Sequence, residues 1–175
     1  DLCLAAHEGR RVREIAAWAL TCIDADEITR SRLMPLARGQ GEADPEDELK
    51  GAALAVLWKA PRQIEPVEMF TLLTRPKDGH LFGSYRGFLE LILPRDLDPD
   101  ILPQALTWFL TKDPPAEVGG DFEDLVDAIL RCGFANLTES LLPDYARAVC
   151  RRLERHNCNV FGAEGQRAGT SITLE

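Results

Sequence analysis

The sequence predicts an all-α fold in which about four antiparallel helix pairs stack as a short HEAT- or armadillo-like solenoid. Apolar residues recur with helical spacing in several stretches, short runs rich in Gly, Pro and Asp divide these stretches, and none alternates as a β-strand would. Eight helices joined by short loops form four consecutive pairs, spaced by about 30–45 residues as in HEAT and armadillo repeats. An irregular helical bundle is the alternative architecture for the same pattern.

Four apolar stripes with spacings of three and four residues identify the most regular helices. They are Val12, Ile15, Ala16, Ala19, Leu20 and Ile23; Leu49, Ala52, Ala53, Val56 and Leu57; Leu102, Ala105, Leu106, Phe109 and Leu110; and Phe122, Leu125, Val126, Ile129 and Leu130. Together with the turn signals they predict helices near residues 8–23, 27–38, 46–59, 65–74, 80–93, 99–112, 121–134 and 140–156. Each stripe is expected to face the core.

Acids and prolines mark the predicted helix starts. Asp44-Pro45 and Asp98-Pro99 each precede a stripe, so the Asp side chain is expected to accept from free N–H groups while Pro occupies the first helical position. Helix ends are expected at Gly39 and Gly41, Pro61, Pro76, Pro114-Pro115 and Gly119-Gly120.

A short internal recurrence supports a repeat. Ile101-Leu102-Pro103 recurs forty residues later as Leu141-Leu142-Pro143, and Leu33-Met34-Pro35 is a fainter third copy. We expect each copy to place Pro in the opening turns of the second helix of a pair, where the ring is tolerated.

The helical domain is expected to span residues 1–156. Residues 157–175 lack helical periodicity and are expected to form a flexible tail, with Leu174-Glu175 a remnant of an expression vector. Because the chain starts at Asp1 rather than Met, we expect it to be part of a longer protein.

The net charge of −9 argues against binding to nucleic acid or to anionic lipid. No apolar run approaches the ~20 residues of a membrane-spanning helix. The basic exception is a group of arginines on one predicted helix, expected to complement a helix C-terminus rather than to bind phosphate. These are Arg147, Arg151, Arg152 and Arg155.

The five cysteines are Cys3, Cys22, Cys132, Cys150 and Cys158, an odd number without C-x-x-C spacing. We expect reduced thiols in a cytoplasmic protein, with the middle three buried as small hydrophobes. Zinc is disfavoured, because the only clustered ligands are Cys150, His156 and Cys158, with Cys132 reaching in, and their spacing is not that of a zinc site.

No stretch provides the glycine-rich signature of a phosphate loop or a dinucleotide-binding turn. Residues 79–84 are the nearest approach and are expected to form a loop leading into a helix. His7, His80 and His156 fall near predicted helix ends and are expected to be solvent-exposed. No catalytic residue, cofactor-binding residue or metal ligand is therefore assigned, and no cofactor is expected.

Two further groups have both a structural and a binding interpretation. Trp18, Trp58 and Trp108 are expected to fill the seams between helix pairs, and the alternative is that they are binding hot spots. The acidic run from Glu42 to Glu48 is expected to be a solvated loop and helix cap, and the alternative is an acidic face for a basic partner.

Half of the chain resembles part of a known class of proteins. The stretches that carry the resemblance are Asp44 to Leu54, continuing to Leu57-Trp58, then Met69 to Lys77 and Phe82 to Leu89, mainly within residues 24–112. They resemble a segment of large bacterial STAND-class, NACHT-type NTPase proteins, in which a HEAT-like helical region beyond the nucleotide-binding module serves sensing or scaffolding. The resemblance implies that any NTPase activity lies in a separate domain.

We therefore expect a non-catalytic scaffold or sensor segment that mediates protein–protein interaction or transmits a signal, with another protein or other domains as partner. The alternative is a small-ligand binder or an enzyme, with a site between helices that uses His80, Cys132 or the arginines. A pocket of a few hundred Å³ with shifted pKa values would indicate it. A third interpretation is a capping or dimerisation domain, which a large exposed apolar patch would indicate.

Overall fold

A computed structural model describes residues 5, 7–22, 26–42, 44–59, 64–75, 77, 83–111 and 121–156. Every regular element in these ranges is helical, which confirms the all-α prediction. The elements are α1 (Arg10–Cys22), α2 (Glu27–Ala37), α3 (Lys50–Trp58), α4 (Pro66–Leu72), α5 (Gly83–Gly87), the π-helix η2 (Phe88–Ile92), α6 (Leu93–Arg95), α7 (Leu102–Thr111), α8 (Asp121–Ala135) and α9 (Leu142–His156). Because α5, η2 and α6 are continuous, the described chain has the eight expected helices. None of them has the length and apolar character needed to cross a membrane.

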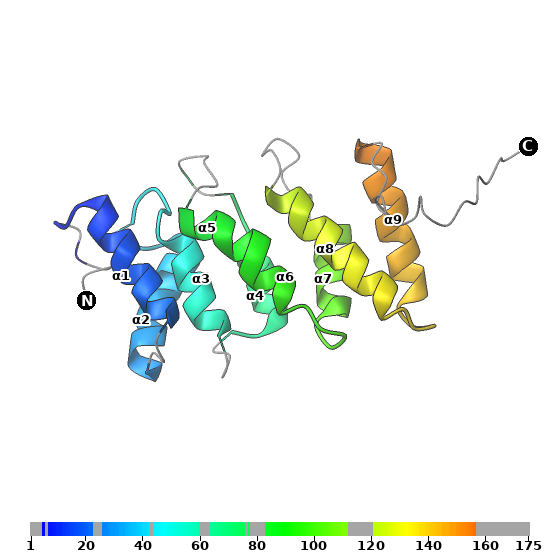
Figure 1. Cartoon of the computed structure of the whole chain (residues 1–175), viewed down its shortest axis with the longest axis horizontal. Coiled ribbons are helices and arrows are strands. Elements are labelled where there is room, and N and C mark those ends of the chain that lie inside the picture. Colours follow the sequence, from blue (N-terminus) through cyan, green and yellow to red (C-terminus); the bar gives the residue numbers. More distant parts are fainter. Residues whose placement is uncertain are drawn as a thin grey trace, which may run out of the picture.

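The helices lie side by side along the long axis of the molecule (Figure 1). In what we name the first-helix row, α1 contacts α3, α3 contacts α5 and η2, and α8 contacts η2 and α6. In the second-helix row, α4 contacts α7 and α7 contacts α9. An ion pair of 2.9 Å between Arg38, at the end of α2, and Glu68 on α4 adds α2 to this row. Consecutive pairs therefore contact one another along the molecule.

Helix α3 forms the centre of the core. All nine of its residues are buried, including those outside the apolar stripe. A helix that is apolar on all sides needs neighbours on all sides, and α3 contacts α1, α2, α5 and η2. The core continues through α7 and α8, whose predicted stripes are buried except for the half-buried Leu110.

The expected position of proline at two helix starts is wrong. Helices α3 and α7 begin at Lys50 and Leu102, so Pro45 and Pro99 lie in the turns before them. The Asp side chains do accept the expected N–H groups, but these belong to the turns, which delays the helix by several residues. The ends predicted at Pro61, Pro76, Pro114-Pro115 and Gly119-Gly120 lie outside the described residues, as does the tail 157–175.

The sequence that recurs after forty residues forms the same turn and helix start in both places. Pro103 and Pro143 are the second residues of α7 and α9, as predicted. The preceding turns share their hydrogen bonds: Ile101 and Leu102 donate to the Asp98 carbonyl, and Leu141 and Leu142 donate to that of Thr138. The third copy is wrong, because Pro35 lies in the last turn of α2.

The orientation of α1 differs in part from the prediction. Ile15 of its stripe is 61% exposed and Val12 and Ala19 are exposed, whereas Arg13 and Ala17 are buried. Arg13 faces a buried carboxylate of the next pair, so the side of α1 that bears Arg13 turns inward. Ala16 and Leu20 of the stripe still pack against the core, so the stripe lies at the border between core and solvent.

Candidate functional site

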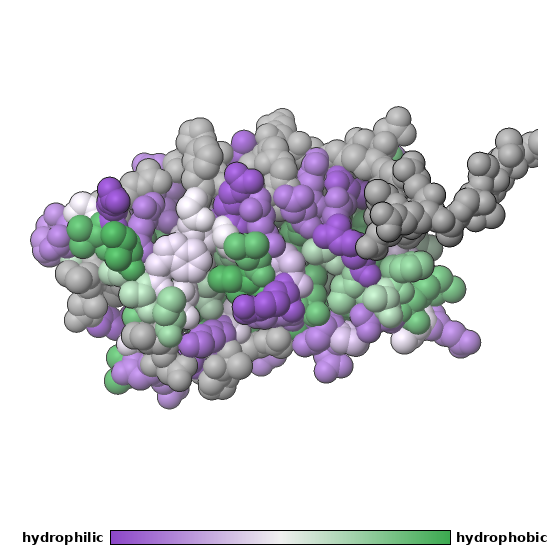
Figure 2. Space-filling view, viewed as in Figure 1, coloured by the Kyte–Doolittle hydropathy of each residue, from purple (hydrophilic) through white to green (hydrophobic). Residues whose placement is uncertain are grey.

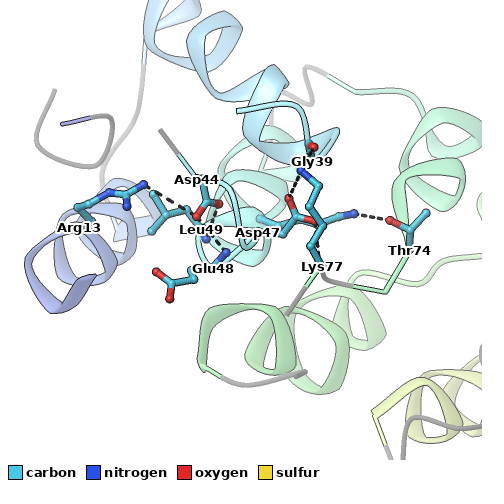
Figure 3. Close-up of polar contacts among 9 residues, drawn as sticks. Arg13, Gly39, Asp44, Asp47, Glu48, Leu49, Thr74 and Lys77 are labelled. Atoms are coloured by element: carbon cyan, nitrogen blue, oxygen red, sulfur yellow. Dashed lines mark hydrogen bonds and ion pairs between the residues drawn. The ribbon is translucent and has the colours of Figure 1, made fainter. Parts of the chain in front are cut away.

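The acidic run before α3 holds buried charges rather than a solvated loop. Asp44 and Asp47 are only 1% and 4% exposed, which contradicts the expectation of a solvated loop (Figure 3). Asp44 caps the turn before α3 rather than the helix itself, whose N-cap residue Leu49 has no side-chain cap hydrogen bond. The Asp44 carboxylate accepts from the N–H groups of Glu48 at 3.0 Å and Leu49 at 2.9 Å. It also lies 3.9 Å from the guanidinium of Arg13, so the carboxylate joins α1 to the start of α3. Burial raises the pKa of Asp44, against the lowering effect of these hydrogen bonds and of Arg13.

Asp47 joins the turn to two more segments. Its backbone has φ of 61°, a left-handed conformation that Asp tolerates better than most residues. Its carboxylate accepts from the Lys77 N–H at 3.3 Å and lies 3.5 Å from the Lys77 ammonium. Lys77 also donates to the Gly39 carbonyl at 2.6 Å. Gly39 is itself left-handed, and a Cβ there would lie 3.1 Å from the Asp47 carboxylate, so only glycine fits easily.

Lys50 is a further buried charge of this cluster, beside Arg13, Asp44 and Asp47. Its ammonium donates to the Thr74 hydroxyl at 2.5 Å and lies 5.7 Å from the centre of the Tyr85 ring, a cation–π distance. The Tyr85 hydroxyl donates to the Thr74 carbonyl at 2.8 Å. Burial lowers the pKa of Lys50 and raises that of Tyr85, because each charged form loses hydration.

We name this group the acidic-turn cluster: Arg13, Gly39, Asp44, Asp47, Lys50, Thr74, Lys77 and Tyr85. Each carboxylate in it has a cationic neighbour, and its members come from α1, α3, α5 and the segments after α2 and α4. Such an enclosed network holds elements in one arrangement rather than presenting groups to a substrate. The cluster therefore fixes the geometry of the first helix pairs.

Three cavities lie elsewhere in the described part of the molecule. The largest, about 760 Å³, lies where α1, α3 and α6 end, and its lining includes Trp58, Lys59, Arg95, Asp96 and Asp98. A groove of about 310 Å³ lies between α4 and α7, and a space of about 380 Å³ lies between α2 and α3. Among the described residues, the groups with a shifted pKa are Asp26, Asp44, Lys50, Tyr85, Cys132 and Tyr145. None of these groups lines any of the three cavities.

Tyr145 and Tyr85 both bury a hydroxyl, but only that of Tyr85 has a hydrogen-bond partner among the described residues. Burial raises the pKa of the Tyr145 hydroxyl. Replacing Tyr145 with Phe is expected to leave the free energy of unfolding unchanged or to raise it by about 1 kcal/mol, because an unsatisfied buried hydroxyl is removed. The matched variant Tyr85→Phe loses a hydrogen bond and should lower it by about 1 kcal/mol. Urea denaturation measures both, and a loss at Tyr145 equal to that at Tyr85 would show that the Tyr145 hydroxyl is satisfied.

The arginines of α9 are used within the fold. Arg152 makes a two-pronged ion pair with Asp127 of α8, at 2.9 and 3.3 Å, and approaches Glu123 at 3.8 Å. Arg151 donates to the Leu110 carbonyl in the last turn of α7, the complement to a helix C-terminus that the sequence predicted. Arg147 pairs with Asp144 one turn earlier. The side chain of Arg155 lies outside the described part.

The cysteine prediction is wrong for two of three helical thiols. Cys22 and Cys150 are exposed, because each lies on the outer side of a terminal helix, and Cys132 is half-buried with its thiol 3.7 Å from the Leu97 carbonyl. Burial raises the pKa of Cys132, which makes it a poor nucleophile. The described residues hold no group of three possible metal ligands, and Cys3, Cys158 and His80 lie outside them. His7 is exposed, and His156 is the last residue of α9.

Two of the three tryptophans fill seams as predicted. Trp58 is buried, and Trp108 packs between helices, with ring centres 5.7 Å from Phe70 of α4 and 6.2 Å from Phe122 of α8. Trp18 is 40% exposed, and its indole lies against α5, 3.5 Å from where a Cβ at Gly87 would be.

Exposed apolar side chains concentrate at the two ends of the molecule. Large ones on α1, α2 and the α8–α9 pair are Val12, Ile15, Trp18, Ile28, Phe134, Leu137, Leu142 and Leu153, whereas the helices between them expose only Val67 and Leu91 among the described residues. Figure 2 shows hydrophobic surface over α1 at one end and around α9 at the other, and a further patch in the middle over the helix that runs from α5 to α6. Helical periodicity alone does not show which of these residues are exposed, because it assigns every stripe to the core.

Comparison with protein-family models, with curated proteins and with solved structures finds no match to this chain.

Proposed function

We propose that this chain is a short HEAT- or armadillo-like solenoid that acts as a non-catalytic scaffold for protein–protein interaction. The two helix rows and the shared turns before α7 and α9 support a repeat of helix pairs. In such arrays each pair contacts only its neighbours, so the terminal pairs and the long lateral surface are available to partners.

The observation that carries the interaction function is the concentration of exposed apolar side chains on the terminal pairs. Scattered apolar residues are normal on a protein surface, but large side chains grouped on one face mark interaction sites. The carboxylates of the acidic-turn cluster, by contrast, are buried, and each has a cationic neighbour within the fold.

Placing a negative charge on each end face by substitution tests the proposal. Ile15→Glu and Leu153→Glu are each expected to reduce the amount of protein that copurifies with the tagged chain from its host cells by at least about tenfold, because a charge at the centre of an apolar contact is left without water. Leu91→Glu is the matched control, since Leu91 is as exposed but lies in the middle of the molecule. Equal capture by all three variants would contradict the proposal.

The proposal includes a reducing, cytoplasmic location. Cys22 and Cys150 are exposed free thiols, which are typical of proteins from reducing compartments. The resemblance to the helical region of STAND-class NTPases is in keeping with this location and with a sensing or scaffolding role, any NTPase activity lying in a separate domain.

A small-ligand site is the second candidate, favoured by the cavity of about 760 Å³ at the ends of α1, α3 and α6. Its lining combines the Trp58 ring with two cationic and two acidic side chains. A ligand held there would raise the thermal midpoint of the wild type and not that of an Arg95→Ala variant. Such a shift would favour this candidate over the scaffold if Ile15→Glu and Leu153→Glu also left the amount of copurifying protein unchanged.

A further inference from the structure

We draw no further inference here: the strongest candidate, the cavity of about 760 Å³ where α1, α3 and α6 end, belongs to the small-ligand site already described, and its two cationic and two acidic side chains favour no single class of ligand.

Discussion

A Gly51→Ala variant is expected to fail to fold, or to lose at least about 3 kcal/mol of its free energy of unfolding. A Cβ at this position would lie 2.1 Å from the backbone N and Cα of Tyr85 and 2.4 Å from the carbonyl carbon of Ser84. The obstruction is backbone, so no side-chain rotation relieves it, and α5 would have to move away from the core. In a solvent-exposed helix the same substitution would stabilise by about 1 kcal/mol.

Chemical denaturation followed by circular dichroism measures this effect. The matched control is Gly9→Ala, because a Cβ at Gly9 would meet nothing within 4 Å. The control is expected to unfold at the wild-type midpoint. A Gly51→Ala variant with the wild-type midpoint would show that α3 and α5 are further apart than described here.

An Asp44→Ala variant is expected to lose about 3 kcal/mol of stability. The substitution removes the acceptor of two N–H groups at the start of α3, a loss of about 1 kcal/mol for an ordinary cap. It also removes the carboxylate that faces the buried Arg13, and breaking a buried ion pair costs about 3–5 kcal/mol when a charge is left behind. We place the ion-pair loss at about 2 kcal/mol, below this range, because the pair distance of 3.9 Å is long, which gives the total of about 3 kcal/mol.

Asp44→Asn and Glu46→Ala separate these contributions. The asparagine keeps one acceptor without the charge and should lie between the wild type and Asp44→Ala, whereas Glu46 is exposed and its removal should change little. Burial raises the folded-state pKa of Asp44 above its ordinary value of 3.8, so the folded chain takes up this proton more readily than the unfolded chain. The stability of the wild type relative to Asp44→Asn should therefore increase as the pH falls through the interval just above 3.8. A decrease would contradict the burial of this carboxylate.

The helices could be predicted because their signals are local. Stripes such as Phe122 to Leu130 depend only on the helical period, and α7, α8 and α9 lie within three residues of the expected bounds. The recurrence of Leu-Pro after forty residues also depends on a local turn, and it appears twice with the same hydrogen bonds.

The side of each helix that faces the core could not be predicted, because it depends on contacts with residues distant in sequence. Arg13 is buried on α1 where it faces Asp44, thirty-one residues later in the sequence, and the periodicity of α1 alone does not show this contact. The burial of Asp47 likewise depends on Lys77, which approaches from the segment after α4. The acidic run is predicted from sequence to be solvent-exposed, although the cationic partners of its buried carboxylates come from two other segments, α1 and the segment after α4.

The π-helix η2 also affects how this protein can change in length. A π turn contains one residue more than an α turn, so the helix from Gly83 to Arg95 holds an extra residue between Phe88 and Ile92. Loss of one residue from this turn would convert it to an ordinary α turn and keep the buried residues on both sides in line with the core. In α7 or α8, where no such surplus exists, the same loss would rotate every later side chain by about 100°. Natural single-residue gaps are therefore expected to fall within Phe88–Ile92 rather than in the neighbouring helices.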